Sequence, residues 1–116
     1  MAKRSRRRER RREPVRTHDY SDPDGNVLTL RDTLSEGTIA KLREPVGGAA
    51  TSADDAWQRR TELLFERLAV RWEIAGLPLT DQKLLLGRYR MADADMRDWV
   101  RSTIAQHVER HIPELG

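Results

Sequence analysis

Apolar and charged positions alternate at helical spacing over residues 53–75, the longest such stretch in the chain. At 100° per residue they form two apolar faces separated by charged positions. The first face holds Trp57, Leu64, Phe65, Leu68, Trp72 and Ala75, and the second holds Ala56, Leu63, Val70 and Ile74. Ser52 and the acids after it are typical of a helix start, and Gly76 with Pro78 is typical of a stop. The pattern predicts one long helix, with the Leu64/Leu68/Trp72 side buried and the Leu63/Val70/Ile74 side shared with a partner.

Shorter patterns on either side of this segment predict a β-hairpin and three further helices. Residues 15–20 and 26–30 flank the turn Asp22-Pro23-Asp24-Gly25, in which proline presets φ and glycine can adopt a positive φ. Helices are expected over residues 34–43, over 81–91, and from Asp93 to just before Pro113. The predicted fold is a mostly helical α+β domain, in which an N-terminal hairpin precedes a bundle of about four helices.

Charge divides the chain into a tail and a domain. Residues 1–16 contain nine Lys or Arg and two Glu, whereas the remaining hundred contain thirteen Lys or Arg and seventeen Asp or Glu. We therefore predict a disordered arginine-rich tail over residues 1–14, a single domain over 15–112 and a short C-terminal end over 113–116. The chain has no cysteine and no apolar run of membrane-spanning length, which makes the cytoplasm the expected compartment.

The basic tail is a candidate nucleic-acid-binding segment, because clustered cations contact successive phosphates. The candidate residues are Lys3, Arg4, Arg6, Arg7, Arg8, Arg10, Arg11 and Arg12. Residues 5–11 resemble the arginine-rich RNA-binding segment of phage antitermination N proteins, which implies a short helix that folds on RNA. No aromatic residue interrupts the run, so stacking on bases is not indicated. A solvated tail and non-specific contact with RNA or DNA are the alternatives.

The long helical pattern also carries a row of arginines between its two apolar faces, namely Arg60, Arg67 and Arg71. One interpretation is that their stems cover the edges of the core while their charged heads stay in water. The other is a helix packed on two surfaces, its own core and a partner, with the arginines facing acidic groups. On the second interpretation, the predicted contact residues are Trp57, Arg60, Arg67, Arg71 and Trp72.

Two histidines lie four residues apart on the last predicted helix, His107 and His111, a spacing that can place both imidazoles on one metal ion. A third ligand would have to be His18 or Glu114. Because both histidines fall on the apolar face near the helix end, packing explains them better, and no metal or cofactor is expected. The acids and serines lie where helix caps need them, so we predict no catalytic residues and a non-enzymatic protein.

The order of elements provides a family resemblance. With residues 27–30 leading into Leu34-Ser35, followed by residues 57–76 and 77–91, the chain resembles the small tail assembly chaperones of long-tailed phages over residues 20–112. The resemblance implies a cytoplasmic, non-enzymatic protein that coats the tape measure protein and helps to recruit tail-tube subunits. The leading prediction is thus a protein-binding assembly factor, and the alternative is a nucleic-acid-binding regulator that uses the basic tail. Self-association stays open.

Overall fold

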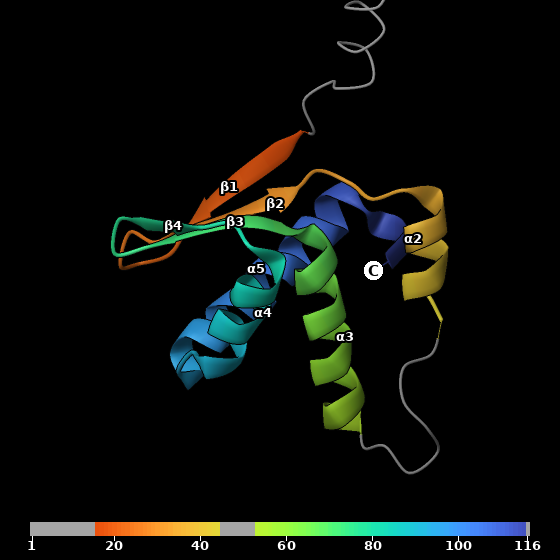
Figure 1. The fold of residues 1–116 in the computed structure, drawn as a ribbon. Coiled ribbons are helices and arrows are strands. Elements are labelled where there is room, and N and C mark those ends of the chain that lie inside the picture. Colours follow the sequence, from red (N-terminus) through yellow and green to blue (C-terminus); the bar gives the residue numbers. More distant parts are fainter. Residues whose placement is uncertain (1–15, 45–52, 116) are drawn as a thin grey trace, which may run out of the picture.

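The computed structural model describes residues 16–44 and 53–115, which form an antiparallel sheet with helices on one side of it (Figure 1). The elements are β1 (Thr17–Ser21), β2 (Val27–Arg31), α2 (Glu36–Leu42), α3 (Ala53–Leu68), β3 (Ala69–Ile74), β4 (Leu77–Leu79), α4 (Gln82–Met91), α5 (Ala94–His111) and the short 3-10 turn η1 (Pro113–Leu115). The predicted α+β class is confirmed. The proposed tail over residues 1–14 lies outside the described residues.

The sheet has four strands in the order β1-β2-β3-β4, every neighbouring pair antiparallel. The predicted hairpin is present as β1 and β2, with slightly different bounds, but it is only half of the sheet. Leu28 pairs with both Tyr20 and Trp72, and this row faces the helices. The neighbouring row, Asp19, Thr29 and Arg71, faces the other way. This alternation is expected of an antiparallel sheet that is covered on one face only.

The prediction of one continuous helix over residues 53–75 is wrong. The helix ends at Leu68, and the chain continues directly into β3. Residues 70–74 read Val-Arg-Trp-Glu-Ile, a strict alternation of apolar and charged residues that suits a half-buried strand. Ala75 and Gly76 then form a two-residue hairpin loop, both with positive φ, at 52° and 78°. As a result α5, with 18 residues, is longer than α3, with 16.

The other predicted helices form close to their expected positions. Ser35, Asp81 and Asp93 are the N-caps of α2, α4 and α5, and each side chain accepts a backbone N–H of the first turn.

The core lies between the sheet and α3, α4 and α5. Its largest fully buried side chains are Trp72 and Phe65, whose rings meet edge to face at 5.7 Å between centroids. The carboxyl end contributes as well, because Ile112 and Leu115 are buried and η1 lies against α2 (Figure 1). Leu64 and Leu68 are buried and Leu63 is 38% exposed, as predicted for the two sides of α3.

Candidate functional site

Helix α3 is bordered by a groove on each of two sides. The first, which we call the α3–α5 groove, has a volume of about 310 Å³. It is lined by Trp57, Arg60, Thr61, Leu64, Arg101, Ile104, Ala105, Val108 and Leu115. Trp57 is 48% exposed, although its neighbours in the groove are largely apolar. A half-exposed indole in an apolar groove with arginines is typical of a protein-binding surface.

The second groove, the α2–α3 groove, is larger, at about 590 Å³. Its lining is Ser35, Gly37, Thr38, Lys41, Leu42, Glu44, Leu63 and Arg67. Leu63 and Arg67 are exposed on α3, one turn apart, so an apolar and a cationic group stand side by side. Lys41 and Arg67 outweigh Glu44, which leaves this groove with one net positive charge.

Arg60 lines the α3–α5 groove and also binds Leu42, a residue of the α2–α3 groove. Its Nη1 donates to the carbonyl oxygen of Leu42, 2.9 Å away at the end of α2, and its Nη2 donates to the carbonyl oxygen of Leu115 in η1. These are terminal carbonyls that a helix cannot satisfy internally. Arg60 therefore holds three elements together, a structural role that the sequence pattern did not reveal.

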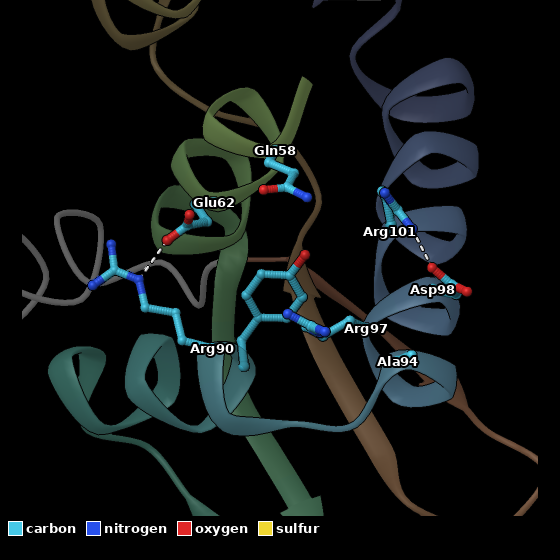
Figure 2. A pocket seen from close by; sticks show the side chains of 8 residues that line it. Gln58, Glu62, Arg90, Ala94, Arg97, Asp98 and Arg101 are labelled. Carbon is cyan, nitrogen blue, oxygen red and sulfur yellow. Dashed lines mark hydrogen bonds and ion pairs between the residues drawn. The ribbon is translucent and has the colours of Figure 1, made fainter. Parts of the chain in front are cut away.

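A third hollow lies between α3, α4 and α5 and is shown in Figure 2. Its volume is about 170 Å³, and its lining is Gln58, Glu62, Tyr89, Arg90, Ala94, Arg97, Asp98 and Arg101. Arg90 donates to Glu62 across the helices, and Arg101 donates to Asp98 within α5. Both acids of the lining are therefore already paired, and the hollow is smaller than either groove, which makes it a weaker candidate for binding a partner segment.

Two of the predicted contact residues do not lie on α3. Arg71 is on β3, on the polar face of the sheet, where it pairs with Glu73 at 3.4 Å. Trp72 is completely buried in the core, so it is not part of the surface. The predicted row of three arginines is interrupted because a strand turns alternate side chains to opposite faces. Trp57, Arg60 and Arg67 are on α3, and the basic residues 3–12 lie outside the described residues.

The fold also brings together all three histidines of the chain, His18, His107 and His111. His107 is completely buried, with its Nε2 2.7 Å from the carbonyl oxygen of Arg31 and its Nδ1 2.6 Å from the hydroxyl of Tyr20. A carbonyl only accepts, so Nε2 carries a proton and donates, while Nδ1 accepts from the tyrosine. Burial lowers the pKa of His107 and raises that of Tyr20, which favours this neutral pair.

The other two histidines flank Asp32, a residue that no sequence pattern singles out. His18 Nε2 lies 2.6 Å and His111 Nδ1 3.4 Å from the same oxygen, Asp32 Oδ1. The hydrogen bond from His18 is the main reason that the pKa of Asp32 is lowered. The hairpin register offers a clue. His18 pairs with Leu30, and Asp32 follows two residues after Leu30, so the two side chains lie diagonally on the same face of the hairpin. The docking of α5 against this hairpin could not be read from the sequence.

In comparisons with known proteins, the chain matches no family model, no curated protein and no solved structure. Of the helices in the described part of the chain, none combines the length and the apolar character that crossing a membrane requires.

Proposed function

We propose that this protein is a non-enzymatic assembly factor that binds another protein through α3 and the two grooves beside it. The observation that carries the proposal is the half-exposed Trp57 in the α3–α5 groove. Aromatic and arginine side chains dominate the binding energy of many interfaces, because they bury large areas and still donate hydrogen bonds.

The shape and charge of the grooves indicate what kind of segment binds. Trp57 and Arg67 are ten residues apart on α3, a separation of about 15 Å along the helix axis. A partner helix with apolar side chains on one face and acidic groups beside them would match both the apolar walls and the cations Lys41 and Arg67. Arg60 is not offered as a contact, since its guanidinium already binds two carbonyl groups of its own chain.

The most concrete form of this proposal is a tail assembly chaperone of a long-tailed phage. Its support is the resemblance in the order of elements, and the partner would be the tape measure protein. The alternative, a nucleic-acid-binding regulator, rests on residues 1–13 alone. Removing that segment separates the two functions: a regulator loses a salt-sensitive mobility shift with RNA or DNA, whereas an assembly factor keeps its protein partner.

The test is co-expression of the full chain with the tape measure protein encoded in the same genome, followed by affinity purification. We expect the two proteins to purify together, and we expect Trp57→Ala and Arg67→Glu each to reduce the yield of the complex. The matched control is Arg59→Glu, which makes the same charge change at an exposed α3 position beside α4. Absence of a complex would contradict the chaperone function. A complex that survives both α3 variants would contradict the binding surface.

A further inference from the structure

Three side chains with metal-ligating atoms converge where β1, the end of β2 and the end of α5 meet. His18 Nε2, an oxygen of Asp32 and a ring nitrogen of His111 all lie within 4.8 Å of one another. They come from positions far apart in the sequence, and their side chains are 37%, 31% and 27% exposed, respectively. The cluster is thus partly sheltered but open to an ion from solvent.

We propose that His18, Asp32 and His111 form a binding site for a divalent metal ion of the zinc class. Two imidazole nitrogens and one carboxylate oxygen are a donor set that suits Zn²⁺, and three protein ligands leave a fourth position for water. Ligands of a tetrahedral zinc ion are about 3.3 Å apart, given metal–ligand distances of about 2.0–2.1 Å. Binding therefore needs the His18–Asp32 hydrogen bond to open slightly as the ion replaces its proton.

The surroundings bring two of the ligands together before any ion binds. The rings of His18 and His111 are stacked, with centroids 4.1 Å apart and planes inclined by 21°. Because a ring nitrogen binds a metal ion in the plane of its ring, the two rings must tilt apart for both to bind one ion. Beneath them His107 packs against both rings, and its own two nitrogens are already engaged by Tyr20 and Arg31. His107 is therefore a supporting residue of the site and not a fourth ligand. The backbone N–H of Asp32 donates to the carbonyl oxygen of Arg16 at 2.8 Å, which fixes the third ligand.

The local charge favours a zinc-class ion over a hard cation such as Mg²⁺. The site offers one carboxylate, and Arg16 acts on Asp32 through its positive charge. Mg²⁺ prefers oxygen ligands and keeps most of its bound water, so a site with a single carboxylate binds it weakly. Zn²⁺ binds imidazole nitrogens well, and this site offers two of them.

The experiment is a calorimetric titration of the full chain, carrying no polyhistidine tag, with ZnCl₂. We expect one site per chain, and no comparable binding of MgCl₂. The chain contains no cysteine, and its one other histidine, His107, already has both ring nitrogens engaged, so a site with two nitrogen ligands must use His18 and His111. His111→Ala and Asp32→Asn should each weaken the affinity roughly 100-fold, since each removes a direct ligand. The control Asp24→Asn, an exposed acid in the β1–β2 turn, should leave the affinity unchanged.

Two results would overturn the proposal. One is the absence of zinc binding by the unaltered chain. The other is zinc binding that Asp32→Asn and His111→Ala leave unchanged, which would place the ion elsewhere. Circular dichroism of each variant checks that it is folded, and Asp32→Asn retains the size of the side chain if His111→Ala disturbs α5. A shift of the visible bands of bound Co²⁺ in the variants gives a second measure of direct ligation.

Discussion

At the scale of single residues, Arg60 illustrates how a predicted contact residue can have a structural role. Its guanidinium donates to carbonyl groups at the ends of α2 and η1. Arg60→Lys keeps the charge but cannot reach both carbonyls, and hydrogen bonds from charged donors each contribute about 1.5–3 kcal/mol. We predict a loss of about 1–2 kcal/mol in the free energy of unfolding, measured by urea denaturation. Arg59→Lys, on the exposed side of α3, should change it by less than about 0.5 kcal/mol. Equal effects of the two variants would contradict the bridging role.

The buried pair of Tyr20 and His107 supports a second prediction. Tyr20→Phe removes the hydroxyl that donates to His107 Nδ1 and leaves a buried acceptor without its partner. Such a loss costs about 1–3 kcal/mol. Tyr89→Phe is the control, because it removes the hydroxyl of a tyrosine that lines the hollow between α3, α4 and α5. Thermal and urea unfolding should show that only Tyr20→Phe is markedly destabilised. If Tyr20→Phe is as stable as the unaltered chain, this hydrogen bond contributes nothing to the free energy of unfolding.

The same pair makes stability depend on pH. Burial holds the pKa of His107 below its ordinary value of 6.5, so the unfolded chain takes up a proton before the folded one. Stability is therefore lost as the pH falls below about 6.5. Asp32 acts in the same direction at lower pH, because its pKa is held below 3.8. We predict a lower urea midpoint at pH 5 than at pH 7, with a smaller difference in His107→Gln. Equal pH dependence in both proteins would contradict this assignment.

At the scale of elements, the loop between β3 and β4 contains a residue that is poorly suited to its conformation. Ala75 has a φ of 52°, in the left-handed region, which costs a non-glycine residue roughly 1–2 kcal/mol. Asn-Gly is strongly preferred in such two-residue loops. We predict that Ala75→Asn raises the free energy of unfolding by up to about 1 kcal/mol and that Ala75→Val lowers it. Urea denaturation distinguishes them, and the opposite order would contradict the geometry of this loop.

The elements that the sequence predicted well are those with local causes. The β1–β2 turn follows from Pro23 and Gly25, and α5 follows from its cap Asp93 and the stop at Pro113. The prediction of a helix over residues 69–74 is wrong because Trp72 also fits the apolar face of a continued helix. Their strand conformation is fixed by pairing with β2, whose residues lie 39 to 46 positions earlier in the sequence. Val70 forms a bulge there, since Leu30 pairs with Ala69 and Thr29 with Arg71.

At the scale of the whole molecule, the candidate sites depend on contacts that no local pattern encodes. Trp57 and Arg67 could be selected from the sequence because they lie on a recognisable helix. The grooves beside them need the docking of α2 and α5, and so does the role of Arg60. The histidine cluster likewise needs α5 to lie across the hairpin. Helical spacing predicts that His107 and His111 lie close together. Only the tertiary fold brings Asp32 next to His111.

The proposed function places protein binding on the whole surface formed by α3 and its two grooves. That surface presents apolar groups and cations together, whereas the outer face of the sheet is polar and carries the Arg71–Glu73 pair. Partner binding should therefore be sensitive to changes on α3 and insensitive to changes on the sheet. Arg71→Glu is thus a second control, at a position that the sequence pattern had assigned to the same row.

The most direct test of the protein-binding surface is the dissociation constant of the complex with the proposed partner, the tape measure protein, measured by calorimetry for the unaltered chain, Arg67→Glu and Arg71→Glu. We predict that Arg67→Glu raises the dissociation constant at least about tenfold, which corresponds to about 1.4 kcal/mol, and that Arg71→Glu changes it little. Equal constants for all three proteins, or a larger effect at Arg71 than at Arg67, would contradict binding through α3.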